Sequence, residues 1–351
     1  EQGIARAQYN LGVMYEDGRG VAKDEAAAVE WYRKAAEQGN ALAQYNLGVM
    51  YDNGRGVAKD EVAAVEWYRK AAEQGNALAQ YNLGVMYEYG RGVAKDEVAA
   101  VEWYRKAAEQ GDAPAQYNLG VMYENGFGVS KDEAVAVEWY RKSAEQGHAP
   151  AQCNLGGMYV NGRGVTKDEA VAVEWFRKSA VQGYAHAQYG LGLMYDNGRG
   201  VAKDEAAAVE WYRKSAEQGY APAQYDLGVV YMNGCGVARD ELVAVEWFRK
   251  SAEQEYAPAQ YNLGVAYMNG CGVAKDELAA VEWFRKSAAQ GDASAQYSLG
   301  VAYMNGRGVA KDEVAAVEWF RKSAEQGYAR AQQAAILAEA LIVLGKTRKK
   351  I

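Results

Sequence analysis

The segment ALAQYNLGVMYDNGRGVAKDEVAAVEWYRKAAEQGN fills residues 41–76, and its pattern returns with few changes along almost the whole 351-residue chain. Nearly all of the 39 glycines hold fixed positions in this pattern. A constant period of about 20–50 residues is typical of a solenoid, whose units cannot bury their own apolar faces. The period here is 36 residues, as the phase of all nine tryptophans shows: Trp31, Trp67, Trp103, Trp139, Trp175, Trp211, Trp247, Trp283 and Trp319.

Each unit is predicted to contain two helices. In residues 41–51 the apolar side chains recur at helical spacing, which indicates a first helix. The two glycines in residues 53–57 then favour a turn. Asp60 stands where a side chain can cap free amide hydrogens, so a second helix is expected from there to about Gln74.

Three positions allow sharper structural predictions. Gly75 suits the left-handed residue just past a helix end. Gly48 lies inside the first helix, where glycine costs about 1 kcal/mol against alanine. Its return in every unit therefore predicts that a tyrosine of the second helix packs against bare backbone. Glu255 replaces the turn glycine of its unit, so that junction is predicted to be strained or reshaped.

Three strings in this unit resemble the Sel-one-like repeat family, a relative of the tetratricopeptide repeat: AQYNLGVMY at 43–51, GRGV at 54–57 and WYRKAAEQG at 67–75. The resemblance extends from residue 1 to about residue 335. It implies an all-α, right-handed α/α superhelical solenoid whose first helices line the concave side. It also implies a scaffold or adaptor role, most often in bacteria and in eukaryotic membrane-associated quality control.

The chain is thus expected to hold nine 36-residue helix-turn-helix repeats in residues 1–328 and a C-terminal capping helix with a basic tail in residues 329–351. Residues 1–3 duplicate residues 37–39, so the sequence begins at the end of a truncated repeat. The first helix that follows is expected to expose a face on which a partner or another copy could stack end to end.

The last unit departs from the pattern. Residues 334–344 predict an apolar helix containing Glu339, too short to span a membrane. A cap whose basic end suits the helix dipole is one interpretation, and an interfacial or partner-docking helix is the other. The basic residues that follow this helix are Lys346, Arg348, Lys349 and Lys350.

Composition excludes several classes of protein. The net charge of −7 disfavours nucleic-acid binding, including the reading of RNA by helical repeats. No apolar run reaches the roughly 20 residues of a membrane helix. The two histidines, His148 and His186, have no cysteine or acidic cluster at metal spacing, so neither metal nor cofactor is predicted.

The cysteines are expected to be free thiols, because neighbouring repeats should lie about 10 Å apart and a disulfide needs closer backbones. They are Cys153, Cys235 and Cys271. Cysteine usage therefore gives no evidence for an oxidising compartment. The sequence given shows no signal peptide, and bacterial cytoplasm, periplasm and secretion all stay open for a soluble protein.

Catalysis is not predicted. The GRGVAK loops lack the Gly-Lys-Ser/Thr of a phosphate-binding loop and join helix to helix. Acidic pairs such as Asp60 and Glu61 recur in every unit as caps, whereas a catalytic site should break the symmetry at one place. Some family members have been linked to β-lactam binding, but no nucleophile for it stands out here.

The candidate binding residues lie on the first helices, which the resemblance places on the concave groove. An asparagine ladder there could donate to and accept from an extended backbone, although a solvated polar face explains it equally well. The groove residues of this kind are Tyr45, Asn46, Tyr81, Asn82, Tyr117, Asn118 and Asn262.

One groove position changes character along the chain. It is acidic in the earlier units, as at Glu88 and Glu124, and becomes methionine at Met232, Met268 and Met304. An acidic half and a soft methionine strip for varied partners is one interpretation, and a repacked core is the other. Tyrosines also replace polar residues in four turns, which is typical of interfaces: Tyr184, Tyr220, Tyr256 and Tyr328.

The sequence predicts a non-catalytic scaffold or adaptor that binds an extended peptide or a partner protein in this groove. One alternative is a β-lactam-binding or hydrolysing enzyme. Another is a recently duplicated or consensus-like array that interacts only by stacking on itself.

Overall fold

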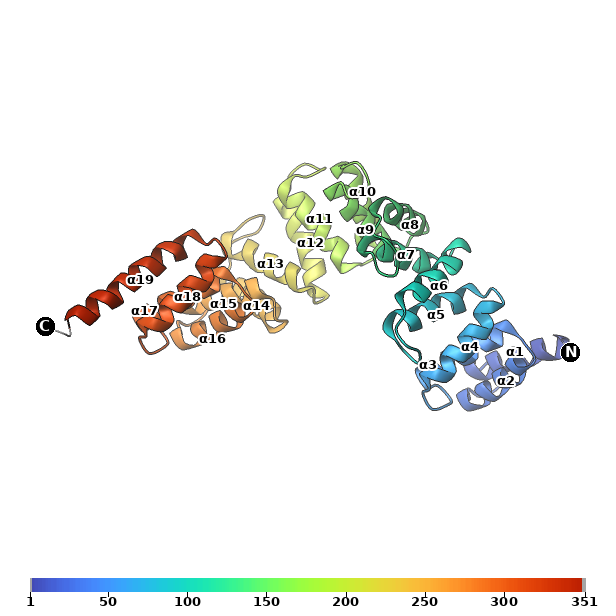
Figure 1. The fold of residues 1–351 in the computed structure, drawn as a ribbon. Coiled ribbons are helices and arrows are strands. Elements are labelled where there is room, and N and C mark those ends of the chain that lie inside the picture. Colours follow the sequence, from blue (N-terminus) through green and yellow to red (C-terminus); the bar gives the residue numbers. More distant parts are fainter. Residues whose placement is uncertain (1, 349–351) are drawn as a thin grey trace. The chain divides into compact units, whose positions relative to one another are not determined.

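The computed structural model describes the backbone of residues 2–348 and the side chains of residues 4–340. Every regular element in this part of the chain is a helix, and short loops join the helices in pairs (Figure 1). The first helices are α1 (Gln2–Asp17), α3 (Ala41–Asn53), α5 (Ala77–Tyr89), α7 (Ala113–Asn125), α9 (Ala149–Asn161), α11 (Ala185–Asn197), α13 (Ala221–Asn233), α15 (Ala257–Asn269) and α17 (Ala293–Asn305). The second helices are α2 (Glu25–Glu37), α4 (Glu61–Glu73), α6 (Glu97–Glu109), α8 (Glu133–Glu145), α10 (Glu169–Val181), α12 (Glu205–Glu217), α14 (Glu241–Glu253), α16 (Glu277–Ala289) and α18 (Glu313–Glu325). A longer helix, α19 (Ala329–Arg348), follows them.

The chain divides into two units, Glu1–Ser179 and Ala180–Ile351. Within each unit a helix packs mainly against the helices before and after it in the sequence. This nearest-neighbour packing is that of a solenoid, so the predicted all-α solenoid is confirmed.

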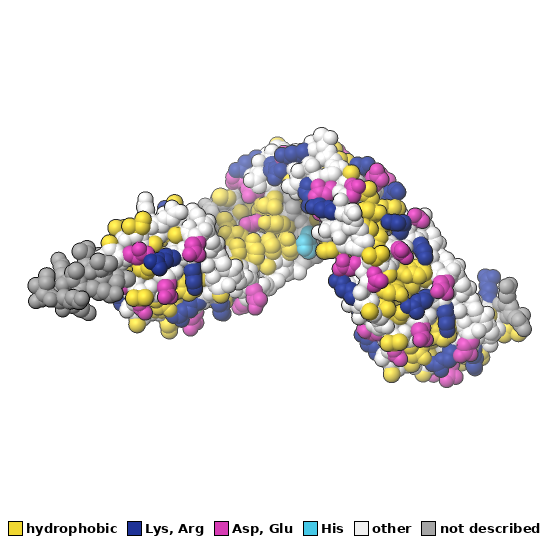
Figure 2. Space-filling view, in the orientation of Figure 1, with side chains coloured by type: hydrophobic (Ala, Val, Ile, Leu, Met, Phe, Trp, Pro, Cys, Tyr) yellow, Lys and Arg dark blue, Asp and Glu magenta, His cyan; other side chains and the backbone are white. Residues whose placement is uncertain are grey.

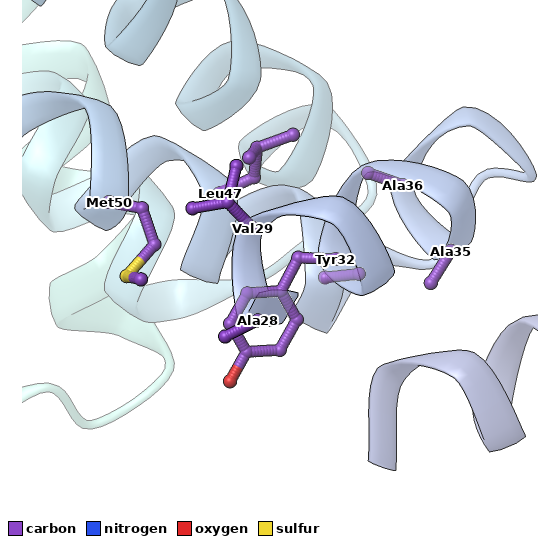
Figure 3. Close-up of a cluster of buried hydrophobic side chains, with 8 residues drawn as sticks. Ala28, Val29, Tyr32, Ala35, Ala36, Leu47 and Met50 are labelled. Atoms are coloured by element: carbon purple, nitrogen blue, oxygen red, sulfur yellow. The ribbon is translucent and has the colours of Figure 1, made fainter. Parts of the chain in front are cut away.

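The cores form between repeats rather than inside them. One cluster joins Val29 and Tyr32 of α2 to Leu47 and Met50 of α3 (Figure 3). Partly buried side chains from the flanking helices, among them Trp67 of α4, close this cluster. Because a repeat supplies only part of each core, its apolar faces are covered only when its neighbours are present.

Side-chain caps and glycines set the helix ends, as predicted for residues 41–76. The Asp60 carboxylate accepts hydrogen bonds from two free amides at the start of α4, each at 3.0 Å. Gly75 has a φ of +90°, in the region that favours glycine. Gly56 is needed for a further reason, because a Cβ there would lie 2.1 Å from the carbonyl oxygen of Glu25 in the preceding repeat.

The glycine inside the first helix makes room for a ring. A Cβ on Gly48 would lie 2.6 Å from Cδ1 of Tyr68, a side chain that is 1% exposed. The predicted contact between this glycine and a tyrosine of the second helix is therefore confirmed.

The junction at Glu255 is strained, as predicted. Among the described residues Glu255 is the one non-glycine with a positive φ, which is 64°. The chain thus keeps the left-handed turn of the other repeats, and strain results because its Cβ disfavours that conformation.

Helix α19 covers the last repeat. It begins at Ala329, before the apolar stretch 334–344, since the carbonyl of Tyr328 accepts the first helical hydrogen bonds. Ala335 and Ala338 are buried in the core that it shares with α18, and Glu339 pairs with Arg321 of α18 at 2.7 Å. The predicted basic tail lies outside the residues whose side chains are described.

Candidate interaction surface on the first helices

The predicted groove residues share one environment. All are half-buried on the first helices, in contact with neighbouring repeats and still open to solvent on one side. They are Tyr45, Asn46, Tyr81, Asn82, Glu88, Tyr117, Asn118, Glu124, Met232, Asn262, Met268 and Met304.

The tyrosines and asparagines of this surface face one another across neighbouring repeats. In the second unit Asn262 of α15 donates to the hydroxyl of Tyr225 in α13 at 3.5 Å. In the first unit Asn82 forms the equivalent hydrogen bond with the hydroxyl of Tyr45. Burial raises the pKa of Tyr45, and this hydrogen bond opposes the rise. Part of the asparagine ladder's hydrogen-bonding capacity is therefore used inside the protein.

The acidic positions are also engaged from within. Glu124 accepts from the buried hydroxyl of Tyr140 at 2.5 Å and pairs with Arg163, in the loop of the next repeat, at 2.9 Å. Glu88 accepts from Tyr104 at 2.5 Å. Burial first, and then these carboxylates, raise the pKa of both tyrosines. Glu124 therefore helps to join two repeats, whereas the bond of Glu88 to Tyr104 lies within one repeat.

This network explains why the acidic position changes character. Wherever it carries an acid, the buried ring of the following helix is tyrosine, and wherever it is apolar, that ring is phenylalanine. The acidic pairs are Glu16–Tyr32, Asp52–Tyr68, Glu88–Tyr104, Glu124–Tyr140 and Asp196–Tyr212, and the apolar pairs are Val160–Phe176, Met232–Phe248, Met268–Phe284 and Met304–Phe320.

The methionines line hollows in the surface of the second unit. One hollow of about 180 Å³ is bordered by Met232, Asn262 and Ala266. The next, of about 200 Å³, is bordered by Met268 and Ala302. The two alanines stand where the repeats of the first unit bury a methionine such as Met50, so shortening this side chain opens the space.

The turn tyrosines add rings beside these helices. Tyr220 lies 5.3 Å from Tyr189 and 4.4 Å from His186, measured between ring centroids. Tyr256 lies 5.6 Å from Tyr225 in the same way. Figure 2 shows the result as a hydrophobic field over α13.

These rings replace helix caps. In the first unit Asn40 at this position accepts a hydrogen bond from Ala43. Neither Tyr220 nor Tyr256 caps its helix with a side chain. Losing such a cap typically costs about 1 kcal/mol, so the aromatic contacts stand at a local cost in helix stability.

A glutamine relay between repeats was missed by the sequence analysis. Gln74 at the end of α4 donates to the side chain of Gln44 at 2.6 Å, and Gln44 donates to the carbonyl of Ala36 in the preceding repeat at 3.0 Å. The signal was available, because the Gln44 position carries glutamine in all nine repeats.

Three further features concern the cysteines, the tryptophans and the helix lengths. Cys153, Cys235 and Cys271 are free thiols, as predicted. Lysines stack on all nine tryptophans, with Lys70 Nζ 4.0 Å from the ring centroid of Trp67 as an example. None of the described helices has the length and apolar character needed to cross a membrane.

A stack of helix pairs whose cores are shared by neighbouring repeats defines an α-solenoid repeat protein. The family model of the Sel1 repeat matches nine consecutive segments, and the chain belongs to this family. The matched residues are 5–40, 41–76, 77–112, 113–148, 149–184, 185–220, 221–256, 257–292 and 293–328. The resemblance seen in the sequence is therefore confirmed.

Two bacterial crystal structures are similar over most of the chain. A protective antigen present in uropathogenic Escherichia coli strains, which displays an SLR fold, is 41% identical, with 97% of this chain and 81% of that chain covered and a TM-score of 0.64. A Sel1 repeat protein from Oxalobacter formigenes is 35% identical, with coverages of 87% and 88% and a TM-score of 0.65. The comparison with curated proteins finds no match.

Proposed function

We propose that this protein is a non-catalytic scaffold that binds an extended peptide or a partner protein along its first helices. Sel1 repeats form a scaffold that commonly serves protein interaction. We assign binding to helices α11 to α17 within the second unit. Its hollows and turn tyrosines interrupt the otherwise regular repeat there.

The hollows at Met232 and Met268 carry this proposal. A cavity of about 150 Å³ lined by apolar side chains can hold a molecule of the size of benzene, so each hollow can accept one apolar side chain. Methionine is flexible and polarisable, which allows it to adapt to different occupants. Half-buried tyrosines and asparagines beside the hollows can supply hydrogen bonds to a peptide backbone.

The proposal can be tested by filling the hollows. A random peptide library is panned on the full chain, and the affinities of selected peptides are then measured by calorimetry. Substituting Ala266→Met and Ala302→Met restores the side chain that the first unit carries at these positions. We expect this double variant to bind the selected peptides at least tenfold more weakly.

The control is Val314→Ala, which shortens a side chain that is 60% exposed on α18 and lies away from the hollows. It should leave the affinities unchanged. Circular dichroism before the titrations shows whether both variants keep their helices. A library that yields no specific peptide, or peptides that bind the filled variant as well as the original chain, would contradict the proposal.

A further inference from the structure

The second unit carries an unusual acid at the asparagine position of the first helices. This position is asparagine in six repeats and aspartate once, at Asp226 of α13. The Asp226 carboxylate accepts a hydrogen bond from the hydroxyl of Tyr189 in α11 at 2.9 Å. Burial raises its pKa to about 6, and the neighbouring charge of Asp196 adds to the rise.

Asp196 lacks the arginine that accompanies three of its four acidic counterparts in the first unit, the exception being Glu88, where Phe127 stands at that spacing. For example, Arg55 pairs with Glu16 at 3.1 Å, and Arg163 pairs with Glu124 at 2.9 Å. The residue at the same spacing from Asp196 is Cys235, which packs on the core of α12 and α13.

Two further described groups act on Asp196 or lie within reach of its charge. Tyr212 donates to its carboxylate at 3.3 Å. Glu205, which pairs with Lys203 at 2.7 Å, is the main cause of the raised pKa of this lysine, and the charge of Asp196 adds to the rise. Two coupled carboxylates therefore stand in adjacent repeats at a place where one arginine has been lost and one acid gained.

Aromatic rings surround this pair of carboxylates. Besides Tyr189 and Tyr212, the rings of Tyr225 and Tyr256 lie nearby. Burial first, and then the charge of Asp226, raises the pKa of both hydroxyls. Figure 2 shows an acidic group inside the hydrophobic field over α13, with a histidine at its edge. Carboxylates framed by aromatic rings suit an organic cation, which is attracted by both.

We propose that Asp226 and Asp196, with the half-buried rings of Tyr189, Tyr225 and Tyr256, bind the side-chain cation of a lysine or arginine in the partner polypeptide. This inference rests on the scaffold function proposed above. The cation would stand where other repeats carry an arginine and Asp196 has Cys235, and it would neutralise the two coupled carboxylates. Charge complementarity therefore selects a basic residue as the occupant.

The position of the site also predicts the spacing of the bound sequence. The carboxylates lie between α11 and α13, and the two hollows follow at α13–α15 and α15–α17. Neighbouring helices pack about 10 Å apart, which is about three residues of an extended strand at 3.3 Å each. The partner motif is therefore a basic residue with one apolar residue three positions away and a second one six positions away, both on the same side of it in the sequence.

The test uses synthetic peptides in which leucines lie three and six residues after a lysine, and peptides in which they lie three and six residues before it. Matched peptides carry glutamine in place of the lysine. Calorimetry measures their affinities for the full chain and for Asp226→Asn, a residue that six repeats already accommodate. We expect one lysine peptide to bind at least tenfold more tightly than its glutamine form, and Asp226→Asn to remove this preference. Cys235→Arg, which restores the internal cation, should remove it as well.

Glu246→Gln is the matched control, because it removes one negative charge from the exposed face of α14. It should leave the preference for lysine intact. Equal binding of lysine and glutamine peptides, or no binding of either, overturns the cation site. If the glutamine peptide binds as tightly as the lysine peptide and the filled variant Ala266→Met, Ala302→Met loses both, the cation site fails while the scaffold proposal stands.

Discussion

The strained turn at Glu255 allows a direct test of how this chain stores backbone strain. Its φ of 64° is that of a glycine turn. A non-glycine residue in this conformation costs about 1–2 kcal/mol, and the greater freedom of glycine in the unfolded chain offsets about 0.5–1 kcal/mol of that. Substituting Glu255→Gly should therefore stabilise the junction of α14 and α15 by about 1 kcal/mol.

The chain offers a matched reverse experiment. Gly219 has a φ of +91°, and a Cβ there would meet no atom within 4 Å. Its neighbours Gln218, Tyr220 and Ala221 are the same residue types that flank Glu255. Gly219→Glu should therefore destabilise its own junction by about the same 1 kcal/mol, from backbone strain alone.

Amide hydrogen exchange resolved by residue is the suitable assay, because a long repeat array need not unfold in one step. A change of 1 kcal/mol corresponds to about a fivefold change in protection. Protection around residues 254–260 should rise in Glu255→Gly, and protection around residues 218–224 should fall in Gly219→Glu. Unchanged or lower protection in Glu255→Gly would refute the reasoning and show that contacts of the glutamate side chain hold the turn.

Three further predictions concern packing and charge. Gly84→Ala should destabilise the first unit by about 1–3 kcal/mol in urea unfolding, because the added Cβ would lie 2.6 Å from the buried ring of Tyr104. Gly157→Ala should instead stabilise this unit by about 1 kcal/mol, because a Cβ there would meet no atom within 4 Å. Glu88→Met and Tyr104→Phe should each destabilise the chain when made alone but largely compensate when combined, and a double-mutant cycle without coupling would contradict this. Asp226→Asn should leave the stability of the fold unchanged near pH 3 and raise it by about 1–2 kcal/mol above pH 7. Burial raises the pKa of Asp226 from 3.8 to about 6, so ionisation of this carboxyl as the pH rises disfavours the folded state. Urea unfolding of both chains at the two pH values checks the sign.

Local features of the fold were predictable from the sequence, and contacts between repeats largely were not. The pairing of Gly48 with Tyr68 could be predicted because glycine is costly inside a helix and this one recurs. The need for Gly56 could not, since it depends on the approach of the Glu25 carbonyl from another repeat. The spacing within a unit gives no sign of that approach.

The candidate surface shows the same division. Glu124 was predicted as a groove residue, but its pairing with Arg163 depends on how neighbouring repeats pack. The joint change of acid with tyrosine, and of methionine with phenylalanine, was readable across the repeats. It was overlooked because each position was compared with itself rather than with its partner.

The restriction of contacts to sequence neighbours has a consequence for how such a chain tolerates damage and change in length. A defect in one repeat weakens the cores shared with adjacent repeats and leaves distant ones intact. Removing one whole period, such as residues 77–112, would rejoin surfaces of the same kind. The number of repeats can therefore vary by gain or loss of entire modules, without any redesign of the interfaces that remain.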